Sequence, residues 1–228
     1  MLQHIQKMSV TSASLMLFML LSADFVFIAV HCVNLLTPIS KLFNIGQDGG
    51  YSEIFQYIKF FWIIILLSYI FLITKVSNYF SWITVFIYLL CDDALAIHEN
   101  LGGKIAEYLN FLSHFNLRPI DFGELIVSMS AGILLLTVVA LSYLQGSPTF
   151  KKISIDLLVL FFSLAFFGVV VDMAHVAIRL GNTVKSALGI IEDGGEMAVT
   201  SLIFWYVFCL ALRKGKPLIF EASNLDEV

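Results

Sequence analysis

Six long apolar segments constrain the fold of this chain more than any other feature. A transmembrane helix needs about 20 predominantly apolar residues, which is longer than most helices in soluble cores. Hydrophobic residues make up 59% of the 228 residues and charged residues only 13%, which excludes an ordinary soluble domain. We therefore predict an all-α, polytopic membrane helical bundle with six transmembrane helices, at residues 9–36, 56–74, 79–99, 121–144, 153–179 and 186–212.

The segments outside the spans are more polar. Between the third and fourth spans, Ile105, Tyr108, Leu109 and Leu112 recur at helical spacing, which is typical of a short helix lying in the membrane interface. Residues 213–228 form a polar C-terminal tail. We expect the whole chain, 1–228, to be a single integral membrane domain embedded in the lipid bilayer.

Six spans place both termini on the same side of the membrane. The N-terminus, the even-numbered connections and the tail hold seven basic and four acidic residues, whereas the other side holds six basic and thirteen acidic residues. Because Lys and Arg favour the cytoplasmic side, we expect both termini inside (N-in, C-in), in a bacterial inner membrane or an equivalent membrane.

Three carboxylates and an imidazole interrupt the end of the third span. In the stretch Leu90 to Glu99, Asp92 and Glu99 are seven residues apart and share one helix face, with Asp93 and His98 on either side of it. An ionisable side chain inside a bilayer costs roughly 2.5–3.5 kcal/mol on insertion scales. We therefore interpret this stretch as the floor of a functional site.

Further acids and histidines are predicted to lie in the same layer of the bundle. Odd-numbered spans end, and even-numbered spans begin, on one membrane face, and most polar residues of the spans lie toward that face. The connectivity therefore predicts that they converge with the stretch that ends the third span. The residues concerned are Asp24, His31, Glu124, Asp172, His175, Glu192 and Glu196.

A divalent metal ion would explain so many carboxylates in one place, because like charges in a low dielectric cannot all ionise without a counter-charge. The i, i+3 pair Asp172/His175 and the i, i+4 pair Glu192/Glu196 resemble the arrangement in carboxylate-bridged metal sites of helix bundles. Oxygen ligands with a few imidazoles suit Zn, Mn, Fe, Ca or Mg and exclude a thiolate site. The predicted metal ligands are Asp92, His98, Glu99, Asp172, His175, Glu192 and Glu196, with Asp24, His31, Asp93 and Glu124 as secondary candidates.

Structural roles are the alternative for each of these residues. The predicted ligands could instead form an internal hydrogen-bond network or pair with Arg179 or Lys185. Asp121 and Asp193 lie near the start of a predicted helix, where an acid caps the helix or suits its dipole. A lone histidine such as His31 is more often a helix-packing residue than a ligand.

Three classes of function fit the pattern. A membrane-embedded, metal-dependent hydrolase of a lipid or amide would use the ion to activate water and Glu99 or Glu196 as general base. A cation- or proton-coupled transporter or channel would use the acids as a coupling site, and a non-catalytic subunit would use them to bind a partner helix or hold the bundle together. Transporters tend to break helices near the midplane. Because all four prolines lie in connections, the hydrolase is favoured.

Other functions find no support in the sequence. The acidic pair Glu192-Asp193 lacks the arginine that follows it in CAAX-type intramembrane proteases, since Met197 stands there. The second predicted span is interpreted as almost featureless, and no retinal-type lysine is expected within a span. Phosphate-binding loops and basic nucleic-acid patches are absent from the sequence. A lipid or small-molecule substrate and a homo-oligomer remain compatible with the pattern.

Overall fold

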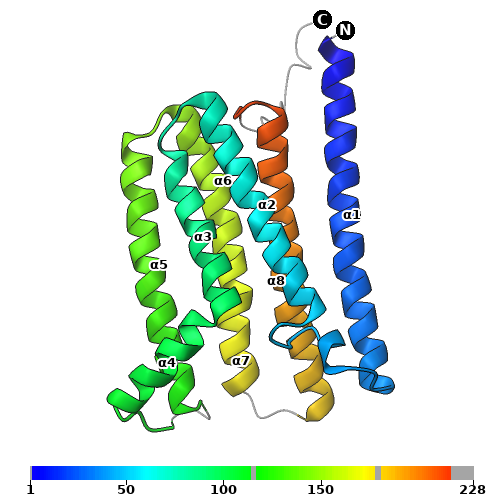
Figure 1. The fold of residues 1–228 in the computed structure, drawn as a ribbon, viewed down its shortest axis with the longest axis vertical. Coiled ribbons are helices and arrows are strands. Elements are labelled where there is room, and N and C mark those ends of the chain that lie inside the picture. The colour runs from blue at the N-terminus through cyan, green and yellow to red at the C-terminus, as the bar shows by residue number, and fades with distance from the viewer. Residues whose placement is uncertain (1, 114–116, 178–180, 217–228) are drawn as a thin grey trace, which may run out of the picture.

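The computed structural model describes residues 2–113, 117–177 and 181–216, and every regular element in these ranges is a helix. The predicted all-α bundle is therefore confirmed. The α-helices are α1 (Leu2–Leu36), α2 (Tyr51–Thr74), α3 (Tyr79–Leu95), α4 (Ile97–Tyr108), α5 (Pro119–Gln145), α6 (Pro148–Ala165), α7 (Asp172–Ala177) and α8 (Asn182–Leu212). Two shorter turns are the 3-10 helix η1 (Lys41–Phe43) and the π-helix η2 (Phe166–Val171). Figure 1 shows the long helices side by side, with α1 and α5 at opposite edges of the bundle.

Five segments are long and apolar enough to cross a membrane, counting only the residues that the structure describes. They are Ser12–Leu36, Tyr51–Thr74, Pro119–Gln145, Pro148–Ala177 and Val184–Leu212. A sixth crossing results if α3 and α4, which are bent by 69° relative to each other, count as one broken span. The chain is thus a multi-pass membrane protein by length and composition. With six crossings, the beginning of α1 and the end of α8 lie at the same end of the bundle (Figure 1).

The third predicted span is broken at Ala96. The α3 helix ends at Leu95 instead of Glu99, and Ala96 adopts the left-handed conformation with φ of 48°. Its N–H donates to carbonyls in the last turn of α3, which closes that helix. The next helix, α4, begins at Ile97, so the predicted short helix exists but starts well before the apolar repeat that begins at Ile105.

The short helix α4 folds back and packs against the first turns of α5. Gly102 of α4 faces Gly123 of α5, and a Cβ atom on Gly123 would lie 2.0 Å from the carbonyl oxygen of Gly102. Only glycine allows two backbones to approach so closely. This crossing fixes α4 at one end of the bundle and places His98 and Glu99 beside the large cavity there.

The fifth predicted span, 153–179, begins earlier than expected and is not a continuous α-helix. It begins at Pro148, which suits the first position of a helix. After α6 the chain passes through the π-helical turn Phe166–Val171 before α7. Such turns carry an extra residue and are frequent at functional sites. The predicted end of this span at residues 178–179, and the tail from residue 217, lie outside the described residues.

The hydrophobic core is centred on α8. In its most apolar window 61% of the residues are buried inside the bundle, against 17% for α1. The α8 side chains pack with α2, α3 and α6 through Ile63, Leu67, Trp82, Phe86, Ile153, Leu157, Ile203 and Leu210. By contrast α1 stands at the edge of the bundle, next to α8 and α2 (Figure 1).

Candidate functional site

A cavity of about 1100 Å³ lies at the end of the bundle that carries α4 and α7. Its walls come from α2, α3, α4, α5, α6, η2, α7 and α8 and from Ile45–Asp48 before α2. No lining residue of the described chain belongs to α1. Segments that are far apart in the sequence therefore share one internal space, and α1 stands outside it.

Eight of the residues singled out in the sequence line this cavity. They come from α3, α4, α5, α7 and α8, that is, from the ends of odd-numbered and the beginnings of even-numbered spans. They are Asp92, Asp93, His98, Glu99, Glu124, Asp172, Glu192 and Glu196. The structure thus brings together the residues for which connectivity predicted a common depth.

Three other predicted residues do not line the cavity. His175 lies behind the lining residue Glu192, to which it is bonded. Asp24 is paired with a lysine of α2, and His31 Nδ1 accepts the backbone N–H of Ile45 at 3.4 Å. Both Asp24 and His31 are buried, so their contacts are made within the protein and not with the contents of the cavity.

His98 and Asp92 form an imidazole–carboxylate pair in the cavity wall. His98 Nδ1 lies 3.0 Å from Asp92 Oδ2, while Asp92 Oδ1 accepts the His98 backbone N–H at 3.0 Å and the Tyr88 hydroxyl at 3.4 Å. Because this carboxylate already accepts hydrogen bonds, we assign the imidazole proton to Nδ1. The other nitrogen, Nε2, is then the basic one and can accept a proton.

A second imidazole–carboxylate pair joins α7 to α8. His175 Nδ1 lies 2.7 Å from Glu192 Oε2. Glu192 and Asp172, which lies one turn before His175 on α7, both line the cavity. This pair therefore places an imidazole directly behind a carboxyl group of the cavity wall.

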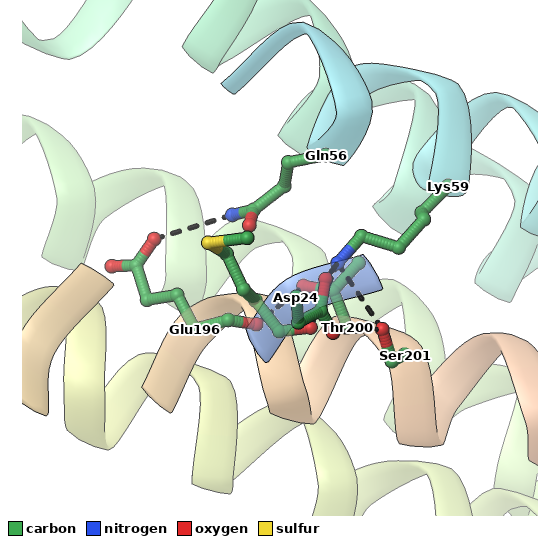
Figure 2. Close-up of polar contacts among 7 residues, drawn as sticks. Asp24, Gln56, Lys59, Glu196, Thr200 and Ser201 are labelled. Carbon is green, nitrogen blue, oxygen red and sulfur yellow. Dashed lines mark hydrogen bonds and ion pairs between the residues drawn. The ribbon is translucent and has the colours of Figure 1, made fainter. Parts of the chain in front are cut away.

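Glu196 projects from α8 between α2 and the π-helical turn. Its Oε2 accepts a hydrogen bond from Gln56 Nε2 at 3.3 Å (Figure 2). On its other side, a Cβ atom on Gly168 would lie 2.4 Å from Glu196 Oε1, so any larger residue would displace this carboxyl group. The π-helical turn and its glycine therefore provide the space that Glu196 occupies.

A buried lysine lies one helical turn from Gln56, and the interpretation of the second span as featureless is wrong. Lys59 has 0% of its surface exposed. Its Nζ donates to Asp24 Oδ1 at 3.0 Å, to the Met197 carbonyl at 2.8 Å and to Ser201 Oγ at 3.2 Å (Figure 2). The Ser201 hydroxyl in turn donates to Asp24 Oδ2 at 2.5 Å.

We call these groups, the side chains of Asp24, Lys59 and Ser201 with the Met197 carbonyl, the ionic anchor. An ammonium group has three protons, and each one here has an acceptor. The anchor therefore joins α1, α2 and α8 and does not present a free amine to a ligand. The sequence signal was available, because Lys59 is a charged residue within an otherwise apolar run.

Four more acids line the cavity that the sequence analysis did not select: Asp48, Glu53, Asp121 and Asp193. Asp121 has the capping role considered above, since its carboxylate accepts the backbone N–H of Arg118 at 2.6 Å and its guanidinium at 2.6 and 3.0 Å. This bonding raises the pKa of Arg118, which stays a cation. Of the other three, Asp193 was interpreted as a helix-start residue, whereas Asp48 and Glu53, which lie just before α2 and in its first turn, were not considered.

The lining carboxylates surround a space and do not converge on a point. Among the described residues, no group of three or more His, Cys, Asp or Glu side chains is arranged to hold a metal ion. An ion in this cavity would therefore be bound through water or after rotation of the surrounding side chains.

Comparison with known proteins identifies a family for this chain. The model of the family described as a domain of unknown function (DUF8692) matches residues 15–212, which include the whole cavity lining and every span except the first three residues of the first span. No curated protein and no solved structure matches the chain.

Proposed function

The chain belongs to the DUF8692 family, and we propose that this member is a membrane-embedded hydrolase that cleaves an amide or ester bond of a lipid. The observation that carries the proposal is the His98–Asp92 pair in the wall of the 1100 Å³ cavity. An imidazole oriented by a carboxylate is a common general base in hydrolases. The polar lining of the cavity suits the water that a hydrolytic reaction within a membrane protein would need.

The reaction that this pair can support is a direct attack by water. The water oxygen bonds to the carbonyl carbon of the substrate while His98 Nε2 accepts a water proton. The C–N or C–O bond then breaks, and the imidazolium returns the proton to the leaving nitrogen or oxygen. Asp92 holds the ring in this orientation and stabilises its charged form.

The predicted catalytic acids Glu99 and Glu196 and a divalent cation belong to the same proposal. Both acids line the cavity with His98, and an ion bound by carboxylates there would polarise the carbonyl group that water attacks. Zn, Mn, Fe, Ca and Mg all accept carboxylate oxygen. Elemental analysis of the purified protein, and turnover after chelation, test this part separately from the histidine.

The test of the hydrolase is turnover of fluorogenic fatty acyl esters and amides by the protein in lipid nanodiscs. We expect the His98→Gln variant to lose at least about 100-fold in kcat, the range for a general base. The matched control is His31→Gln, because His31 is a histidine outside the cavity, and its kcat should stay within about twofold. No hydrolysis of any acyl substrate, or equal turnover by His98→Gln, would contradict the proposal.

A second candidate, a cation- or proton-coupled transporter, gains support from two breaks in the helices. The chain bends at Ala96, and the π-helical turn Phe166–Val171 interrupts the α6–α7 span. Both breaks adjoin the cavity, so the lack of prolines within spans no longer argues against transport. In sealed vesicles a transporter would carry an ion current that Asp92→Asn abolishes, whereas a hydrolase would carry none.

A further inference from the structure

The cavity extends away from its carboxylates into an apolar arm between α5 and α6. We define the apolar arm by Met129, Gly132 and Leu136 of α5 and Phe162 and Phe166 of α6. Met129, Phe162 and Phe166 are 58%, 55% and 51% exposed. Because these residues lie within spans, their exposed surface faces the acyl chains of the membrane, and the arm is open sideways to lipid.

Gly132 shows that the arm contains unfilled space. A Cβ atom added at this position would meet nothing within 4 Å. This glycine is therefore not required for close packing of helices, unlike Gly102 and Gly123 at the α4–α5 crossing. A glycine inside a helix is less favourable than alanine, and here it leaves room beside an apolar wall.

The charge of the polar part of the cavity indicates what the other end of an occupant must carry. Eleven Asp and Glu residues line the cavity, against the histidine His98 and the single arginine Arg118. The Arg118 guanidinium is already bonded to Asp121. A phosphate or carboxylate head group would therefore be repelled by the acids, and the lining offers it no arginine or lysine that is not already paired. An ammonium group would be attracted.

We propose that the substrate of the cavity is a lipid with an amine in its head group. The alkyl chain lies in the apolar arm between α5 and α6, and the amine lies among the carboxylates, with Glu192 and Glu196 within the same cavity. Asp121 is paired with Arg118 and Asp92 with His98, and one divalent ion would offset two further carboxylates at most. Those of the remaining carboxyl groups that are ionised would attract an amine with or without a metal. This inference rests on the proposed function for its chemistry but concerns binding alone.

The experiment compares three ligands with the same chain: hexadecylamine, hexadecanol and palmitate. Their binding to the protein in nanodiscs is measured against empty nanodiscs, with the radiolabelled ligand. We expect the amine to bind at least about tenfold more tightly than the alcohol, a difference of about 1.4 kcal/mol. Palmitate should bind to nanodiscs that contain the protein no better than it binds to empty nanodiscs. Equal binding of the three ligands would overturn the proposal.

Two variants locate the chain. Gly132→Leu should fill the apolar arm and weaken amine binding at least about tenfold. Gly132→Ala adds a smaller side chain and should weaken binding less, and it provides the test if Gly132→Leu does not fold. The control Leu134→Phe changes a 67% exposed α5 residue outside the cavity lining and should bind normally. Amine binding that survives both Gly132 changes would reject the arm as its site. Because binding needs no turnover, selective binding without hydrolysis would refute only the hydrolase.

Discussion

The ionic anchor and the cavity use the same kinds of charged residue in opposite ways. In the anchor, Lys59 and Asp24 are 0% and 4% exposed in their side chains, and the donors and acceptors of both are paired within the protein. In the cavity, eleven carboxyl-bearing residues share a space with one arginine and one histidine. The two regions touch, since Gln56 of the cavity wall lies one turn before Lys59 on α2 (Figure 2).

The difference teaches how buried charge can be assigned to structure or to function in one small bundle. A buried charge whose partners all come from the protein is stabilised by those partners. Removing one partner leaves the other charge buried and uncompensated. Carboxylates that crowd a cavity without matching cations are strained until a proton, an ion or a ligand arrives. Such sites are frequently stabilised when a charge is removed, at the expense of activity. Substitutions in the two regions should therefore change stability in opposite directions.

The largest expected effect is the loss of the lysine in the anchor. Lys59→Met leaves Asp24 buried without its cation and should lower the free energy of unfolding by roughly 3–5 kcal/mol, the range for breaking a buried pair. The measurement is thermal or denaturant unfolding in detergent micelles. Lys152→Met, which changes an exposed lysine on α6, is the matched control and should stay within about 0.5 kcal/mol of the parent.

A double variant sharpens the same prediction. Lys59→Met combined with Asp24→Leu removes both charges, and apolar side chains suit this part of the membrane. It should recover most of the stability that Lys59→Met loses, since replacing both members of a buried pair is often neutral. If the double variant is no more stable than the single one, the loss comes from packing and not from the uncompensated carboxylate.

A smaller effect is expected from the serine that bridges the pair. Ser201→Ala removes a hydroxyl that accepts from Lys59 and donates to Asp24, and hydrogen bonds to charged groups contribute roughly 1.5–3 kcal/mol. Unfolding should show a loss in this range. Ser163→Ala serves for comparison, because Ser163 bonds only to the Val159 carbonyl of its own helix at 2.9 Å. If Ser201→Ala and Ser163→Ala lower the free energy of unfolding equally, the hydrogen bonds of Ser201 to the charged pair contribute no extra stability.

Much of the fold could be predicted from the sequence, because lipid allows few solutions for long apolar segments. What the sequence did not reveal are breaks without proline. The left-handed residue that ends α3 is Ala96, so no glycine in the sequence marks this helix end. The π-helical turn at Phe166–Val171 lies where Gly168 leaves room for Glu196. Both depend on contacts between helices, which periodicity along one helix does not contain.

The sequence predicted part of the cavity lining and missed part of how its charged residues are arranged. Connectivity alone placed Asp92, Glu99, Asp172 and Glu196 at one depth, and all four line the cavity. It did not separate Asp24, which bonds to a lysine on a neighbouring helix. Which acid faces a cation and which faces a space is decided by the rotation of each helix about its axis, and that rotation is set by packing across the bundle.

The smallest effect, and the one with the opposite sign, is expected in the cavity. Asp193 lines the cavity together with Glu192, Asp172 and Glu53, and Asp193→Asn removes one acid with almost no change in shape. We expect the free energy of unfolding to stay the same or to rise by up to about 1 kcal/mol.

The same substitution in the anchor, Asp24→Asn, should instead lower the free energy of unfolding by several kcal/mol, because Lys59 then loses its counter-ion. Unfolding of the two variants under identical conditions compares one chemical change at two sites. If Asp193→Asn destabilises the protein as much as Asp24→Asn does, the cavity carboxylates are structural, and the division between anchor and cavity fails.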